Sequence, residues 1–284
     1  MNRIYAGIEG YGSTLENSQV LLQSVQYDGT STWGKGADKG FENFLNASEN
    51  MEIYDIETDS EPVLKGVNIL PPLLDFQSPD SCYNAVYQRS KELLDKNMFL
   101  TFFGGEHSVS IGIIDAFREK YSDLTVLQLD AHADLRNEYL GSKYNHACAM
   151  HRASQTANLI QVGIRSMDDC ENQFIDKSKC FFDQDIHSDD SWMNIAIEKM
   201  TETVYITIDM DAFDPAIFPA TGTPEPGGLQ WYQALKFLKK VFESRNVVGF
   251  DIVEFAPIEG LLYPDFLVAK LYYKLLAYKF YYGN

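Results

Sequence analysis

Basic residues are scarce in this 284-residue sequence: 23 Lys and Arg stand against 41 Asp and Glu, which gives a formal net charge of −18 at pH 7. Proteins that bind nucleic acid need clustered basic side chains to neutralise phosphates, so nucleic acid is not an expected partner. A negative field of this kind attracts small cations. The composition therefore favours a positively charged small substrate, with solubility alone as the alternative explanation of the charge.

Long hydrophobic runs are also absent. No stretch approaches the roughly 18 apolar residues of a membrane-spanning helix, so no membrane association is expected. Residues 1–20 lack the basic start, apolar middle and cleavage site of a secretory leader. The aromatic segment 266–282 is interrupted by Lys270, Lys274 and Lys279 and is expected to be a packed C-terminal helix.

Cysteine is sparse and irregularly spaced. Cys82, Cys148, Cys170 and Cys180 form neither a C-x-x-C pair nor a dense framework. Secreted disulfide-stabilised domains have such frameworks, so reduced thiols and a cytoplasmic location are expected. Internal repeats, low-complexity tracts and Pro/Ser-rich linkers are missing as well, and residues 1–284 are expected to form a single domain with a full hydrophobic core.

The pattern that is present is an alternation of short apolar runs with helix-like stretches. Buried strands separated by helices indicate β-α units and a parallel sheet covered on both faces, in which ligands bind at the carboxyl ends of the strands. The predicted strands are 20–25, 98–103, 124–129, 158–164, 203–208 and 246–250, with weaker candidates at 51–56 and 179–184. The predicted helices are 81–97, 110–121, 192–200 and 229–244.

Acidic and histidine side chains crowd the end of one of these strands. In LQLDAHADLR (127–136), Asp130, His132 and Asp134 recur at every second position, so in extended backbone they point to the same side. Buried together without a partner, the carboxylates would repel each other and lose hydration, and a cation would compensate them. A metal site is one interpretation of this motif, and a polar loop start with a chance histidine is the other.

Two further strand ends supply additional donors. His107 follows the predicted strand at 98–103, and Asp209 and Asp211 follow the one at 203–208 with the same two-residue spacing. Four carboxylates and two imidazoles exceed the needs of one tetrahedral zinc; they suit two divalent ions, and the oxygen-rich set favours manganese. A close metal pair can activate water for attack on an electrophilic carbon. The sequence therefore predicts a two-metal hydrolase.

These segments resemble the ureohydrolases, the family of arginases, agmatinases, formimidoylglutamases and guanidino-acid hydrolases. The matching stretches are GGEHS, DAHADLR, NH at 145–146, ITIDMDAFDPAIFPATGTPEPGGL and GFDIVEFAP, in family order between residues 104 and 257. YDGTSTWGKGAD, near residue 27, is similar to the family's early glycine-rich loop but continues as GADKGF where relatives often have G-A-R-x-G-P, which leaves open a role in assembly or site closure.

The resemblance implies a fold, cofactors and residue roles. The fold would be a three-layer α/β/α arrangement with a mostly parallel eight-stranded sheet, binding two Mn²⁺ per chain and assembling as a homo-oligomer, a trimer or a hexamer. The six donors named above coincide with the family's metal ligands. His146 falls where the family has a mobile-loop histidine that carries protons, and Glu254 where a glutamate pairs with the guanidinium. Thr223 lies in the loop that walls the substrate, and Asp134 would also orient the attacking hydroxide.

The expected substrate follows from the same resemblance. Arginases have Asn and Gly where this sequence has Arg136 and Ala147, and the pattern here is more similar to agmatinases. Asp168 and Glu171 fall where arginases hold the substrate's α-amino group and would here bind the terminal amine of agmatine, provided Arg136 pairs with an acid such as Glu138. The expected reaction is cleavage of agmatine to urea and putrescine, a step of polyamine biosynthesis. Formimidoylglutamase, arginase and guanidinobutyrase remain alternatives, and a one-metal deacetylase is a more distant one.

Overall fold

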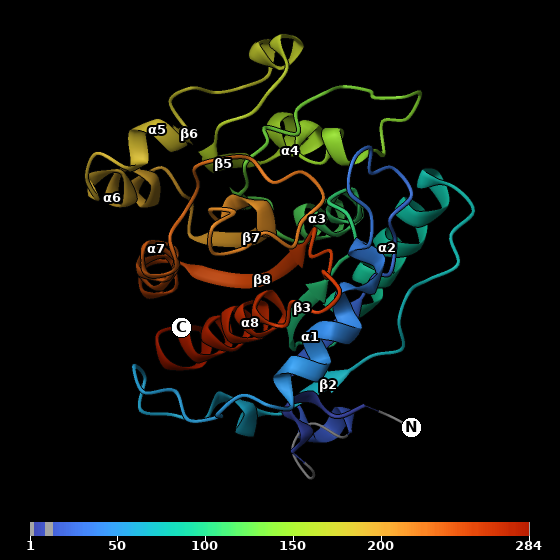
Figure 1. Cartoon of the computed structure of the whole chain (residues 1–284), viewed down its shortest axis with the longest axis vertical. Helices are drawn as coiled ribbons and strands as arrows, with labels where there is room; N and C mark the ends of the chain where they lie inside the picture. The colour runs from blue at the N-terminus through green and yellow to red at the C-terminus, as the bar shows by residue number, and fades with distance from the viewer. Residues whose placement is uncertain (1–2, 9–13, 284) are drawn as a thin grey trace.

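A single sheet of eight parallel strands forms the centre of the computed structural model, which describes residues 3–8 and 14–283. Residues 1–2, 9–13 and 284 lie outside the described residues, and the expectations for a single domain over 1–284 and for no leader in 1–20 stay predictions. The strands are β1 (Val20–Ser24), β2 (Val67–Ile69), β3 (Phe99–Phe103), β4 (Thr125–Leu129), β5 (Asn158–Ile164), β6 (Cys180–Phe182), β7 (Thr203–Asp209) and β8 (Asn246–Val253). Their order is β2-β1-β3-β8-β7-β4-β5-β6, and each neighbouring pair is parallel (Figure 1).

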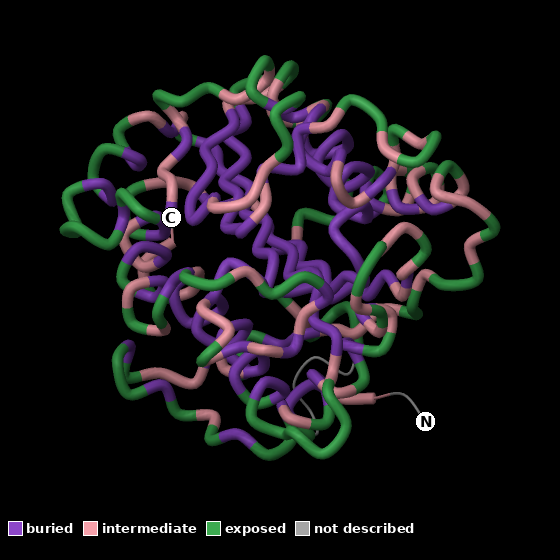
Figure 2. The backbone as a smooth tube through the Cα atoms, turned by 45° about the horizontal axis from the view of Figure 1, so that its top comes forward, coloured by how far each residue is buried: buried purple, intermediate pink, exposed green. Residues whose placement is uncertain are grey.

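Helices cover both faces of the sheet, which confirms the three-layer α/β/α prediction (Figure 1). One hydrophobic core joins the sheet to α1 (Gly40–Ser48), α6 (Ser191–Glu198), α7 (Trp231–Ser244) and α8 (Tyr263–Tyr281). The second core joins the opposite face to α2 (Pro79–Leu94), α3 (Val109–Lys120) and α4 (His151–Thr156). The short α5 (Asp183–Ile186) follows β6. Figure 2 shows the buried segments running through the middle of the molecule, with exposed segments at its rim.

Short 3-10 helices occupy several loops. They are η1 (Tyr5–Gly7), η2 (Leu15–Asn17), η3 (Ala37–Lys39), η4 (Pro62–Lys65), η5 (His146–Cys148), η6 (Asp169–Gln173) and η7 (Met210–Ala212). The last three follow β4, β5 and β7, where the sequence predicted site residues.

The strand predictions hold for the six strong candidates and for 179–184, which contains β6, but 51–56 is wrong. That segment is irregular and packs on α8: the Tyr273 hydroxyl donates to the Ile53 carbonyl, and Lys274 donates to Asp55. Two of its apolar side chains pack on the core that includes α8 and two are exposed, and its strand pairing is limited to one isolated bridge between Asp55 and Ser60. The edge strand β2 has only three residues, too few for a periodic signal.

The C-terminal aromatic segment is the packed helix that the sequence predicted, α8. Its Lys274 is almost buried and pairs with Asp55 at 2.9 Å and Glu57 at 2.6 Å, which satisfies the charge inside the protein. Among the described residues, neither this helix nor another is long and apolar enough to span a membrane. All four cysteines are free, as expected.

Parallel strands bring the predicted site residues to one edge. β3, β4 and the first six residues of β7 consist of fully buried apolar or neutral side chains, the composition expected of strands covered on both faces. Charged side chains and histidines appear only where these strands stop. Because all eight carboxyl ends lie on the same side, the segments that follow β3, β4, β5, β7 and β8 converge there.

Candidate active site

The first group of donors surrounds His107, which follows β3. Its Nδ1 lies 3.0 Å from Asp130 Oδ2, 3.1 Å from Asp134 Oδ2 and 3.4 Å from Asp209 Oδ2. All four side chains are buried. Burial lowers the pKa of His107, but these carboxylates raise it well above its usual value. The group therefore needs a positive charge at its centre, supplied by a proton or by a metal ion.

Residues behind His107 fix the orientation of its ring. His107 Nε2 lies 3.0 Å from the Thr207 hydroxyl, which donates to Asp251 Oδ1 at 2.6 Å. Because the threonine proton is used there, Nε2 is the nitrogen that donates and Nδ1 is the one turned toward the carboxylates. Nδ1 has no hydrogen-bond partner of acceptable geometry among the described residues. Such a backing hydrogen bond is typical of metal-binding histidines.

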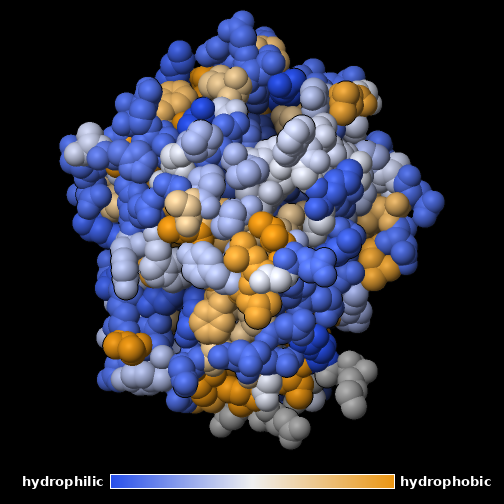
Figure 3. Space-filling view, in the orientation of Figure 1, coloured by the Kyte–Doolittle hydropathy of each residue, from blue (hydrophilic) through white to orange (hydrophobic). Residues whose placement is uncertain are grey.

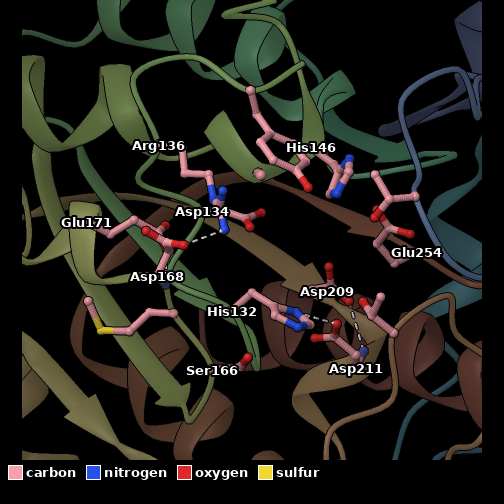
Figure 4. Close-up of a pocket in the computed structure, with 16 residues that line it drawn as sticks. His132, Asp134, Arg136, His146, Ser166, Asp168, Glu171, Asp209, Asp211 and Glu254 are labelled. Atoms are coloured by element: carbon pink, nitrogen blue, oxygen red, sulfur yellow. Dashed lines mark hydrogen bonds and ion pairs between the residues drawn. The ribbon is translucent and has the colours of Figure 1, made fainter.

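The second group of donors is centred on His132, two residues beyond Asp130. His132 Nδ1 lies 2.9 Å from Asp211 Oδ2 (Figure 4). It lies 3.8 Å from Asp130 Oδ1. Asp211 Oδ2 is also buried without a hydrogen-bond partner within the described part of the chain. Asp130 belongs to both groups, with Oδ2 on the side of His107 and Oδ1 on the side of His132. One carboxylate is thus placed to join two ligand sets.

The carboxylates of these two groups carry more negative charge than a buried site can hold without a counter-ion. Burial, with the charges of Asp211 and Asp134, raises the pKa of Asp130 to about 7. Burial and the same kind of repulsion raise the pKa of Asp209 well above its usual range. Although burial lowers the pKa of His132, Asp211 raises it to about 11. Carboxylates that hold protons near neutral pH are groups that a cation would stabilise, so the donor set fits a metal centre.

A cavity of about 270 Å³ opens beside these donors. It is lined by all the predicted site residues except His107 and Asp130, together with Thr32, Tyr139, Ser166 and Met167, which no sequence pattern indicated. Figure 4 shows Glu254 at one end of the cavity and Asp168 with Glu171 at the other. The predicted residues among the lining are His132, Asp134, His146, Asp168, Glu171, Asp209, Asp211, Thr223 and Glu254.

Two acidic residues of the cavity adopt left-handed backbone. Asp134 has φ 52° and Glu254 has φ 62°, a conformation that side-chain-bearing residues avoid outside special sites. Glu254 is held by two contacts: its main-chain N–H donates to Gly105 O, and its Oε1 accepts the His107 N–H, each at 2.8 Å. Burial and the nearby Glu106 charge raise the pKa of Glu254 well above its usual value. A cation in the cavity would stabilise its carboxylate form.

The acids at the other end are already engaged. Asp168 accepts from Arg136 Nη2 at 3.2 Å, so the acidic partner of Arg136 is Asp168 and not Glu138. Glu171 is buried, and its two oxygens accept the N–H groups of Leu135 at 2.7 Å and Asp168 at 2.6 Å. Glu171 therefore holds the loop together, while Asp168 remains partly exposed beside the cavity.

The loop that contains His146 and the early loop near residue 27, both implicated by resemblance alone, also reach this site. His146 begins η5 and packs edge-on against Tyr139, with ring centroids 6.2 Å apart. The early loop supplies Thr32 to the cavity, and its Gly34 N–H donates to Gly222 O at 3.1 Å. Thr223, next to that glycine, lines the cavity as well. The early loop is thus part of the wall of the site.

The fold and the donor set define a class: a three-layer α/β/α protein with a metal-type centre built from histidines and carboxylates at the carboxyl edge of a parallel sheet. Residues 18–277 match the Arginase family, and the chain belongs to it. The N(1)-aminopropylagmatine ureohydrolase of Synechocystis sp. is 34% identical, with 92% of this chain and 89% of that protein aligned. The agmatinase of Pyrococcus horikoshii is 30% identical over 84% of each chain.

Solved structures agree with this assignment. The agmatine ureohydrolase of Thermoplasma volcanium superimposes with a TM-score of 0.86 at 28% identity, covering 99% of this chain and 95% of that one. The protein is therefore a ureohydrolase, a hydrolase that acts on guanidino compounds.

Proposed function

We propose that the protein hydrolyses the guanidinium group of agmatine to urea and putrescine, with two Mn²⁺ per chain. One observation carries the proposal: a single cavity has Glu254 at one end, acids at the other and, between them, donors from both metal-ligand groups, His132, Asp134, Asp209 and Asp211 (Figure 4). The balanced reaction takes one guanidinium and one water and gives one urea and one protonated amine. One end of the cavity is proposed to bind the guanidinium head of the substrate and the other end its tail.

Glu254 is proposed to bind the guanidinium head. Its Oε1 is fixed by the His107 N–H, so the carboxylate has a defined orientation before substrate enters. A carboxylate recognises a planar guanidinium by paired, charge-assisted hydrogen bonds. The raised pKa of Glu254, caused by burial and Glu106, indicates a site that is completed by a cation.

The proposed metal ligands are His107 with Asp130, Asp134 and Asp209 on one side, and His132 with Asp211 and Asp130 on the other. Two divalent ions held there would supply a strong nucleophile from water at neutral pH. Oxygen donors outnumber nitrogen donors in this set, and such sets favour Mn²⁺. Asp134, whose unusual backbone directs its carboxylate into the cavity lining, is proposed to orient the attacking oxygen as well.

His146 is proposed to protonate the leaving amine. It lines the cavity and is an imidazole, the side chain whose ordinary pKa lies closest to neutrality. Proton donation at the amine nitrogen allows the carbon–nitrogen bond to break without expelling an amide anion. Thr223 is proposed to wall the substrate from the opposite loop.

The far end of the cavity favours a cationic tail. Asp168 is partly exposed there, and Arg136, the one arginine in the lining within the described part of the chain, is already paired with it. A substrate carboxylate, as in arginine, guanidinobutyrate or formimidoylglutamate, would have to compete for that arginine among several acids. A buried, unpaired carboxylate costs several kcal/mol, on the order of 100-fold or more in specificity.

A second candidate substrate is N(1)-aminopropylagmatine, the compound in the names of several relatives at 32–34% identity. It carries the same head with a longer polyamine tail, so Glu254 and the metal donors do not distinguish it from agmatine. The discriminating contacts would lie at the Asp168 end of the cavity.

The test is product identification with manganese-loaded protein and five substrates: agmatine, N(1)-aminopropylagmatine, arginine, guanidinobutyrate and formimidoylglutamate. We expect urea from agmatine with kcat/KM at least ~100-fold above that for arginine, a difference of about 2.7 kcal/mol. A higher kcat/KM for the aminopropyl compound would transfer the assignment to it. Faster release of formamide from formimidoylglutamate would reject a cationic tail altogether.

The setting of the enzyme is proposed from the same reasoning. A putrescine-forming hydrolase would act in polyamine biosynthesis in the cytoplasm, with free thiols. A homo-oligomer, trimeric or hexameric, is proposed. Large exposed hydrophobic side chains, among them Ile56, Trp33 and Tyr232, support association, although the face in Figure 3 is mostly hydrophilic with scattered hydrophobic groups. Size-exclusion chromatography with light scattering would measure the mass of the particle and therefore the number of subunits. No nucleic-acid or membrane partner is proposed.

A further inference from the structure

A buried carboxylate outside the proposed catalytic set anchors the early loop. Glu106 is fully buried directly before His107. Its Oε2 accepts the main-chain N–H groups of Thr30 and Ser31 at 2.7 and 2.8 Å. Its Oε1 accepts from the hydroxyls of Thr30 at 2.6 Å and Ser108 at 2.5 Å. Surrounded by donors on both oxygens, Glu106 acts as an acceptor and fixes the loop after β1 against the site.

Thr30 connects this carboxylate to His146. Its Oγ1 lies 3.1 Å from His146 Nδ1 and accepts the main-chain N–H of His146 at 3.0 Å. A hydroxyl has one proton and two lone pairs. The proton goes to Glu106, because that is the shortest contact of the Thr30 hydroxyl and both oxygens of Glu106 act as acceptors in this network. Both lone pairs are then left for the two nitrogens of His146.

This hydrogen bonding decides which ring nitrogen carries a proton. Thr30 has no proton left to donate, so Nδ1 of His146 must donate to it. We propose that Thr30, held by Glu106, is a positioning residue that fixes His146 in the Nδ1–H tautomer and leaves Nε2 to exchange protons with the cavity. The consequence for catalysis rests on the proposed function, whereas the tautomer follows from the hydrogen bonds alone.

The same contact serves both charge states of the imidazole. When Nε2 takes up a proton, Nδ1–H keeps its bond to Thr30, so the ring does not have to reorient between accepting and releasing a proton. Tyr139, at 90° to the ring, supports this orientation from the side. The early loop, whose role the sequence left open between assembly and site closure, thereby gains a function inside the site.

The tautomer of His146 can be read by ¹⁵N NMR of the whole protein with labelled histidine, using His146→Ala to assign the signal. The protein is loaded with magnesium for this experiment, because paramagnetic manganese would broaden the signal. We expect a protonated Nδ1 and an unprotonated Nε2 in the neutral ring. Thr30→Val should abolish this preference, and Thr30→Ser should restore it. Ser31→Ala is the matched control, because its hydroxyl contacts Glu106 at 3.1 Å and should leave the tautomer unchanged. A protonated Nε2 in the wild type, or an unaltered spectrum in Thr30→Val, would overturn the proposal.

Turnover provides a second readout. Thr30→Val removes a hydrogen bond from the imidazolium and should lower kcat about 10- to 100-fold with little change in KM, and Thr30→Ser should recover most of the loss. In the His146→Ala background the same substitution should add less than about 3-fold, because the two residues act together. Full additivity would contradict the proposal. If the wild type hydrolyses none of the guanidines, the proposed function fails, and the NMR result still decides the tautomer.

Discussion

Replacing Glu254 by glutamine would remove a buried negative charge from one end of the cavity while keeping the size of the side chain. In the wild type, Oε1 accepts the His107 N–H at 2.8 Å. The amide oxygen of glutamine can keep that bond, which turns its NH₂ group toward the substrate, so a donor would face the donors of the guanidinium. Breaking a buried ion pair costs about 3–5 kcal/mol. This corresponds to a loss of roughly 10²- to 10⁴-fold in kcat/KM.

The assay is the initial rate of urea release from agmatine at substrate concentrations below KM, with metal content measured on the same samples. Glu254→Gln should retain its metal. Glu138→Gln is the control, because it makes the same chemical change at an exposed carboxylate outside the cavity lining. A loss below about 5-fold with full metal content would refute guanidinium binding by Glu254. Loss of metal would show instead that Glu254 acts through its contact with His107.

Further predictions concern the metal donors and the proton carrier. Asp130→Asn should reduce metal at both donor groups, because one oxygen faces each; elemental analysis that shows one ion fully retained would contradict a shared ligand. His146→Ala should keep its metal while turnover falls by about 10²-fold or more, and metal loss would make His146 a ligand. Metal uptake should release protons near pH 7 and weaken as the pH falls, since burial and neighbouring carboxylates raise the pKa of Asp130 to about 7. Titration calorimetry in two buffers of different ionisation enthalpy measures the number of protons released on metal binding, and binding heats that do not depend on the buffer would contradict proton release.

The site was predictable from the sequence where a local rule applied. Asp130, His132 and Asp134 alternate at the end of a buried strand, and Asp209 and Asp211 repeat the spacing after another. Parallel strands bring such ends to one edge whatever their separation in the chain, so local patterns were enough to place the donors together. The buried strands β4 and β7 were predictable for a second reason, because each is a run of buried apolar and neutral side chains with no charged residue before the strand end.

Contacts between distant segments were not predictable. Thr30 lies 76 residues from Glu106 and 116 residues from His146, and neither periodicity nor turn chemistry links them. The ion pair between Arg136 and Asp168 also joins distant segments, since the two residues lie 32 positions apart, whereas the sequence suggested the near neighbour Glu138 as the partner. Each depends on where loops settle once the sheet has formed. The segment 51–56 failed as a strand because its hydrogen bonds run to α8, through the Ile53 carbonyl and the Asp55 carboxylate, and a two-residue period does not reveal such contacts.

The most direct test of guanidinium hydrolysis is to incubate the manganese-loaded protein with agmatine in H₂¹⁸O and to identify every product. Attack of water on the guanidinium carbon, with the alkyl amine as leaving group, predicts equal amounts of urea and putrescine, with ¹⁸O in the urea and none in the amine. Ammonia with a carbamoyl amine, in place of urea with putrescine, would show that the other carbon–nitrogen bond is cleaved and would contradict the proposed role of His146. Absence of any product from agmatine and from N(1)-aminopropylagmatine would contradict the proposed substrate class.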